Sequence, residues 1–321
     1  MGNDTDVQDA DRLLHYRAKR SEWIRLLDGD PVHSIAQQIS AMLWNDAAYR
    51  VFNEARRYAS KDAPTAAIAP MLAETLDIGY LATQVLAISK LIEREAGNPN
   101  KSVVSLRRVV DDVAANRDLF TREIYVTHDE VPYDPEPARQ RHLSRVRSQR
   151  PPLAMWLPTT GVEAWSTSER RHCEFDRLSR MTKGTRLRGE KVRPEVIAVL
   201  QASFDQPVFS ELLDIRHKLI AHAADANNRP SIIARTNLDR VASAHRVISQ
   251  VAHVVSGTLL LSNGSSGLPT PQFDQFEHLA NVFVAPEHLD RLNDFWEEHS
   301  RKRDQWLVTA DAELLSGCTS Q

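Results

Sequence analysis

The sequence predicts an all-α protein built as an antiparallel bundle of helices. Glycine is scarce, with 11 residues in a chain of 321. No segment shows a convincing alternation of apolar and polar residues, which is the pattern of a half-buried strand. Apolar residues instead recur every three or four positions, between breaks marked by proline, glycine and asparagine. Long amphipathic helices bury their apolar faces best against one another, and this favours a bundle.

The N-terminal half is expected to hold a polar segment followed by three helices. Residues 1–30 are polar, and the part from 9 to 27 could form a short helix. The three helices are expected at 31–58, 64–96 and 103–120. Pro31 suits a first helical turn, where the missing N–H is not needed, and Gly97-Asn98-Pro99 ends the second helix.

Residues 121–165 are expected to form an irregular basic insertion. Prolines at 132, 135, 137, 151 and 152 interrupt any long helix, so only a short helix near 139–148 is expected. Residues 137–193 carry twelve Arg and two Lys against five acidic residues, although the whole chain has a net charge of only −3. Such a region can attract polyanions through phosphate contacts. It can equally be a solvated loop, and both interpretations stay open.

The C-terminal half is expected to continue the bundle and then to add a separate piece. Ser166 to Glu169 has the spacing of a capping box before a helix at 168–181, and Asp205 is a good cap for a helix at 206–223. Further helices are expected at 194–203 and 238–261. The bundle domain is therefore expected at 31–262, and residues 263–321 are expected to be a linker and a C-terminal helical appendage.

Composition predicts a cytoplasmic protein. The only cysteines, Cys173 and Cys318, lie far apart, so a disulfide framework is not expected. The first residues are acidic and lack a signal-peptide pattern. No uninterrupted apolar run reaches the length that a membrane-spanning helix needs, so no contact with a membrane is expected. His245, His253 and the pair His172-Cys173 lack the spacing of metal ligands, so no metal site is expected.

One stretch, residues 211–222, places ionisable groups within an otherwise apolar helical face. On a helix with about 100° per residue, Leu212 and Ile215 lie on one apolar arc, Arg216 lies within that arc, and His222 lies on its border. A guanidinium keeps its charge and must find an anion, carbonyl groups or water. Histidine readily exchanges protons near neutral pH. Together, Arg216 and His222 could bind a phosphate group and exchange a proton with it.

A purely structural interpretation of the same residues is also open. The aliphatic part of an arginine can cover apolar surface while the guanidinium reaches water. Asp214 and Lys218 stand four residues apart, in the order that favours a weak surface ion pair.

The string Asp-Ile-Arg-His-Lys-Leu-Ile-Ala-His, residues 214–222, resembles the Arg-x(4–6)-His motif of the HEPN superfamily of all-helical nucleases and toxins. It is similar in particular to the AbiU-like abortive-infection branch, as are the upstream segments 105–112 and 116–123. The resemblance implies a HEPN-like antiparallel bundle and a metal-independent endoribonuclease without cofactors. Arg216 would clamp the phosphate, His222 would carry the proton, and His217 would orient the phosphate or the other catalytic side chain.

The resemblance also implies RNA as the substrate, a role as a toxin or in antiviral defence, and a homodimer. In one straight helix Arg216 and His222 lie about 9 Å apart along the axis and about 120° apart around it, so a second copy would have to complete the site. Whether an antitoxin or another defence component is a partner stays open. We expect RNA contacts from Lys218, Arg139, Arg141, Arg145 and Arg147. The alternative function is a non-catalytic helical module that binds RNA or a protein.

Overall fold

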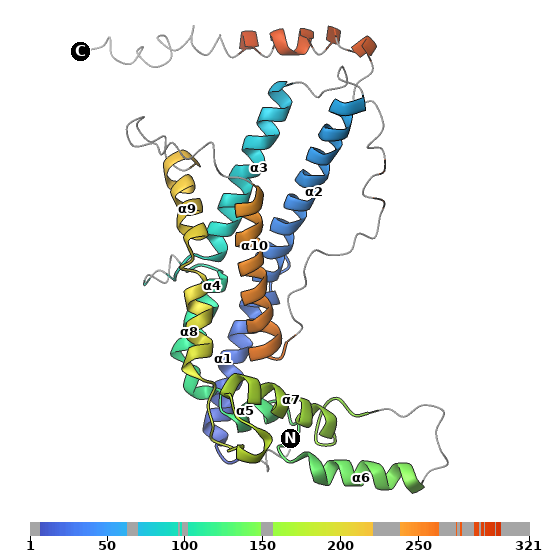
Figure 1. Cartoon of the computed structure of the whole chain (residues 1–321), viewed down its shortest axis with the longest axis vertical. Helices are drawn as coiled ribbons and strands as arrows, with labels where there is room; N and C mark the ends of the chain where they lie inside the picture. Colours follow the sequence, from blue (N-terminus) through green and yellow to red (C-terminus); the bar gives the residue numbers. More distant parts are fainter. Residues whose placement is uncertain are drawn as a thin grey trace, which may run out of the picture. The chain divides into compact units, whose positions relative to one another are not determined.

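The computed structural model describes residues 7–62, 70–95, 97, 102–148, 157–220, 238–262, 274, 277, 286–288, 290–291, 293–298 and 300–302. Within these residues the chain is helical and has no strand, which confirms the all-α prediction (Figure 1). Thr121 and Lys191 form one isolated antiparallel β-bridge. The chain divides into two compact units, Met1–Pro269 and Thr270–Gln321.

Ten α-helices make up most of the described part of the first unit. They are α1 (Ala10–Asp28), α2 (Ile35–Asp62), α3 (Pro70–Leu91), α4 (Leu106–Ala115), α5 (Arg122–Thr127), α6 (Pro135–Ser148), α7 (Trp165–Ser179), α8 (Pro194–Ser203), α9 (Pro207–Ile215) and α10 (Leu238–His253). Short 3-10 helices occur at η3 (Arg117–Leu119), η4 (Lys183–Thr185) and η9 (Pro286–His288). Two π-helices, η5 (Arg216–Ile220) and η8 (Val254–Leu259), continue α9 and α10.

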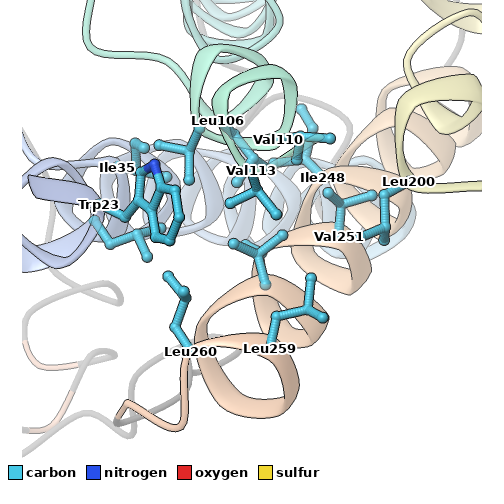
Figure 2. Close-up of a cluster of buried hydrophobic side chains, with 14 of the residues drawn as sticks. Trp23, Ile35, Leu106, Val110, Val113, Leu200, Ile248, Val251, Leu259 and Leu260 are labelled. Carbon is cyan, nitrogen blue, oxygen red and sulfur yellow. The ribbon is translucent and has the colours of Figure 1, made fainter. Parts of the chain in front are cut away.

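The core lies where α1, α4, α8 and α10 meet. Figure 2 shows Trp23 of α1, Val113 of α4 and Val251 of α10 converging with Leu259 of η8. All four side chains are at most 3% exposed. The helices α2 and α3 run side by side, and α10 packs against both (Figure 1). This arrangement gives α9 and η5 their support, because both pack against α3.

The short helix predicted at 9–27 is present as α1, and it packs into the core together with the helices of the bundle. Tyr16 and Trp23 are completely buried, and Trp23 Nε1 donates a hydrogen bond of 2.6 Å to Asp112 Oδ2 of α4. The helix is capped by Asp9, whose carboxylate accepts from the Arg12 amide. Its many charged residues lower its mean hydropathy and hide a narrow apolar stripe.

The insertion is more regular than expected, because α5 and α6 both lie within 121–165. The prolines 135 and 137 do not prevent α6, since they fall in its first turn, where the backbone N–H groups have no intrahelical partner. The short helix α5 is buried along its whole length. The predicted helix at 139–148 therefore begins earlier, at Pro135.

Two predicted caps are wrong. The N-cap of α7 is Ala164 and that of α9 is Gln206, and neither makes a side-chain capping bond. Asp205 instead accepts a hydrogen bond of 2.9 Å from Arg107 Nη2 of α4. An ion pair between α4 and the turn that joins α8 to α9 has replaced the local cap, which local spacing cannot predict.

The helix α3 differs from the other core helices in its exposure. The segment Met71–Leu91 is long and apolar enough to cross a membrane by length and composition, and 22% of its apolar window is buried. Glu74, Asp77 and Lys90 interrupt the apolar run, so this helix is not an uninterrupted apolar stretch in the sequence. The absence of membrane contact therefore stays a prediction.

Candidate functional site

The motif segment begins on α9 and changes helical type at Arg216. Phe209, Leu212 and Ile215 of α9 are buried, as the helical wheel predicts for Leu212 and Ile215. At Arg216 the α-helix gives way to the π-helix η5, in which hydrogen bonds reach five residues back. Short π segments within helices occur frequently at functional sites, because they reposition the side chains that follow.

The side chain of Arg216 is half-buried and keeps its charge uncompensated within the described structure. None of the described residues hydrogen-bonds or ion-pairs with its guanidinium group. Its backbone N–H, by contrast, is satisfied by the carbonyl groups of Leu212 and Leu213. A permanently charged group in this position favours an anionic ligand.

Of the other motif residues, His217 and Lys218 lie on η5 together with Arg216, whereas His222 lies outside the described residues. His217 is exposed and Lys218 is half-buried on the same π turn. Lys218 Nζ lies 3.5 Å from Asp214 Oδ2, the predicted surface ion pair. His222 falls in 221–237, which the structure does not describe.

The motif is fixed to its neighbours by packing and by one ion pair. Both α9 and η5 pack against α3, and α9 also packs against α10. Arg240 Nη1 of α10 lies 2.5 Å from Glu211 Oε2 of α9. The position of Arg216 is therefore determined by two long helices.

The arginines of α6 form a second set of predicted site residues, and an acidic side chain already engages two of them. Arg141 Nε donates to Glu163 Oε1 at 2.9 Å, and Arg145 Nη2 lies 3.2 Å from Glu163 Oε2. Arg139 lies over the Trp165 ring at 5.6 Å, and Arg147 is exposed. The same face carries a shallow hollow of about 630 Å³ lined by Pro137, Gln140, Arg141, Ser144 and Arg145. Its cations are thus partly neutralised.

The α6 arginines and the motif do not form one continuous site. The helix α6 packs on α7, whereas the motif packs on α3 and α10. Figure 1 shows α6 and α7 at one end of the first unit and α9 toward the other. A single ligand would have to be extended to touch both sets.

A buried polar cluster joins α2, α3 and α10, and sequence reasoning missed it. His245 Nε2 lies 2.9 Å from Gln84 Oε1, and its Nδ1 lies 4.0 Å from Asp46 Oδ2. Asp46 also accepts from Tyr80 at 2.5 Å and from Arg50 at 2.7 Å. Burial lowers the pKa of His245, and the nearby Asp46 opposes that change.

This cluster also contacts the start of α10. Arg50 Nη2 donates to the carbonyl of Leu238, the first residue of α10, at 3.0 Å. The only signal in the sequence is the spacing of four residues between Asp46 and Arg50, which many surface ion pairs share. In the part of the chain that the structure describes, no group of three or more His, Cys, Asp and Glu side chains could hold a metal ion.

Comparison of the chain with protein-family models, with curated proteins and with solved structures finds no match.

Proposed function

We propose that this protein is a metal-independent endoribonuclease of HEPN type. The observation that carries the proposal is Arg216, a half-buried arginine at the start of a π-helix that none of the described residues neutralises. Phosphate matches the fork of N–H donors that a guanidinium group presents. The resemblance of residues 214–222 to the HEPN motif identifies RNA as the phosphate-bearing substrate.

RNA carries its own nucleophile, so the chemistry requires only proton transfer and charge stabilisation. The 2′-hydroxyl loses its proton as its oxygen bonds to phosphorus, the bond from phosphorus to the 5′-oxygen breaks, and that oxygen takes up a proton. The products are a 2′,3′-cyclic phosphate and a 5′-hydroxyl. Arg216 holds the phosphate, His222 carries the proton and His217 orients the phosphate or the other catalytic side chain.

The proposal includes a homodimer that acts in the cytoplasm without a cofactor. Arg216 and His222 stand six residues apart, too far for both to contact one phosphate from a single straight helix. The Arg216 and His222 of a second copy therefore complete the site. The resemblance to the abortive-infection branch places the activity in a toxin or in antiviral defence, where an antitoxin or another defence component is the expected partner class.

Cleavage of total RNA in EDTA tests the proposal. We expect the wild-type protein to leave cyclic-phosphate ends and the Arg216→Ala variant to lose about 10²–10³-fold in rate, because a donor aimed at developing charge is removed. Arg216→Lys keeps the charge but loses the fork, and should retain a small part of the activity. Arg246→Ala removes an exposed arginine of α10 and serves as the matched control. Equal rates for Arg216→Ala and wild type would rule out the assigned role.

A second candidate function is a non-catalytic module that binds RNA or a protein. The observation that favours it is the hollow on α6 with Arg141 and Arg145 in its lining. In that case the neutralisation of the α6 arginines should weaken RNA binding and its salt dependence, whereas Arg216→Ala should change neither binding nor RNA integrity.

A further inference from the structure

A cavity of about 720 Å³ lies between the start of α6, α7 and the segment 183–188. Cavities that bind small molecules have volumes of about 300–1,000 Å³, so this one is large enough for a molecule of the size of a tripeptide. Of the site residues predicted from the sequence, Arg139 alone lines it. The cavity is therefore separate from the motif around Arg216.

The wall of the cavity holds Cys173 of α7, an exposed cysteine that forms no disulfide. Arg186 lies beside it, and Arg186 Nη2 donates to Cys173 Sγ at 3.8 Å. Reactive cysteines lie in exposed and positively charged surroundings of this kind, and their sulfur atoms attack disulfides. Cys173 is therefore placed to react with a molecule held in the cavity.

The two arginines nearest in sequence to η4 are fixed by ion pairs with other elements. Arg186 Nε donates to the carboxylate of Asp176 on α7 at 3.1 Å. Arg188 Nη1 donates to Glu123 Oε1 of α5 at 2.6 Å. These pairs hold the loop that follows η4 against α5 and α7, so this side of the cavity is formed before a ligand arrives.

Lys183, Glu169 and His172 each offer the cavity a polar group that has no partner among the described residues. The side chains of Lys183 and Glu169 are exposed, whereas His172 is 5% exposed. Burial lowers the pKa of His172, which keeps the ring neutral. Its Nε2 lies 2.8 Å from the carbonyl oxygen of Tyr133 and so carries the proton, which leaves Nδ1 as an unpaired acceptor. The wall thus lacks an anion for Lys183, a cation for Glu169 and a donor for His172.

We infer that this cavity holds a small peptide disulfide with carboxylate and ammonium groups, and that Cys173 exchanges with it to form a mixed disulfide. The sulfur of Cys173 bonds to one sulfur of the bound molecule, and the bond between the two sulfur atoms of that molecule breaks. The departing sulfur takes the electron pair of that bond and the proton that Cys173 loses, and it leaves as a free thiol. Cys173 is oxidised and the departing half is reduced, so no other oxidant is required.

The mixed charge of the wall favours such a ligand over a polyphosphate or an RNA strand. Asp134, Glu136 and Glu169 line the cavity together with its cations, and these carboxylates repel a polyanion. A zwitterionic peptide places a carboxylate next to Lys183 and an ammonium group next to Glu169. The N–H groups of its peptide bonds supply the donor that His172 lacks, and the unpaired acceptor no longer costs stability.

Exchange of the reduced, full-length protein with glutathione disulfide tests the inference. Cys318, the other cysteine of the chain, is the internal reference, and mass spectrometry of the two cysteine-containing peptides follows both thiols. We expect Cys173 to react about ten- to a hundredfold faster than Cys318 in the folded protein, because the disulfide is held beside its sulfur. In urea that unfolds the protein the two rates should become similar.

Hydroxyethyl disulfide, which has no charged group, separates binding in the cavity from simple exposure of the thiol. With this reagent the preference for Cys173 over Cys318 should fall below about threefold, because the charges of the wall have nothing to hold. An equal preference with both disulfides would make Cys173 an ordinary exposed thiol and overturn the inference. Equal rates of the two cysteines with glutathione disulfide would overturn it as well.

Charge reversal at Lys183 tests the wall of the cavity directly. Lys183→Glu should slow the reaction of Cys173 with glutathione disulfide about three- to tenfold and leave its reaction with hydroxyethyl disulfide unchanged. Lys90→Glu makes the same change of net charge at an exposed position of α3 and serves as the matched control. A Lys183→Glu protein that reacts with glutathione disulfide at the wild-type rate would contradict the assigned contact.

The inference and the proposed function fail separately. No RNA enters the exchange assay, and Arg216→Ala should leave the rate at Cys173 unchanged. Cys173→Ser should lose the mixed disulfide at this position and keep the cleavage of RNA that the wild type shows.

Discussion

The buried arginine Arg122 allows a prediction of stability whose size follows from its contacts. Arg122 is fully buried, with Nη2 2.8 Å from Glu190 Oε2 and Nη1 2.8 Å from Asp176 Oδ1. It also donates to the carbonyl of His172 and to Ser179 Oγ, each at 3.2 Å. Its guanidinium carbon lies 4.8 Å from the centre of the Phe175 ring. This one side chain links α5, α7 and the segment before α8.

Replacement of Arg122 by Leu should cost about 3–5 kcal/mol of unfolding free energy, because it leaves a buried carboxylate without its cation. Most of that cost belongs to Glu190, which is 11% exposed. Asp176 keeps Arg186, whose Nη2 lies 2.5 Å away. The loss is a large part of the total stability of an ordinary domain.

Urea unfolding followed by tryptophan fluorescence measures the effect, with Arg177→Leu as the control. The Arg177 side chain is 76% exposed and pairs with Glu174 within the same helix, so its loss should cost well under about 1 kcal/mol. The double variant Arg122→Leu/Glu190→Met should recover at least half of the loss, because it removes the unpaired charge as well. A loss below about 1 kcal/mol for Arg122→Leu, or a double variant no more stable than the single one, would refute the reasoning.

Two further predictions concern pH and RNA affinity. Burial lowers the pKa of His128 to about 4 from its usual 6.5. Between these two pH values His128 is protonated in the unfolded chain but neutral in the folded chain. The free energy of unfolding of the wild type should therefore fall by about 2 kcal/mol between pH 7.5 and pH 5. Urea unfolding of His128→Asn should show a fall that is smaller by that amount. Glu163→Gln removes the carboxylate charge that faces Arg141 and Arg145 and, if α6 binds RNA, should raise the affinity for RNA about three- to tenfold and steepen its salt dependence in fluorescence anisotropy. Glu174→Gln is the matched control, and equal affinities would exclude α6 as the RNA contact.

Periodicity alone predicts much of the fold, because helices bury their apolar stripes. In α4 the predicted stripe Leu106, Val109, Val110 and Val113 is buried in full. Local spacing fails where a tertiary contact competes with it. Asp205 has the right chemistry for a cap, but Arg107, 98 residues away, takes its carboxylate.

The candidate site could be predicted only in part. The helical wheel places Arg216 beside the buried Leu212 and Ile215, since that relation depends only on helical geometry. No residue type in the segment 216–220 requires the change from α to π at Arg216, so the sequence does not predict it. The pairing of Arg141 with Glu163 joins residues 22 positions apart, which charge counting along the sequence treats as independent.

The helix α3 shows what periodicity cannot decide. The pattern predicts one apolar stripe that includes Leu72, Leu76, Val85 and Ile88, but only the latter two are buried. Spacing indicates which residues share a face, whereas the number of available neighbours decides whether that face is covered. Within the described part of the chain, α2, α9, α10 and η5 cover the other sides of α3 and leave its N-terminal half apolar and exposed. The tertiary arrangement therefore decides which faces of a helix are covered, and the periodicity of the sequence alone does not show it.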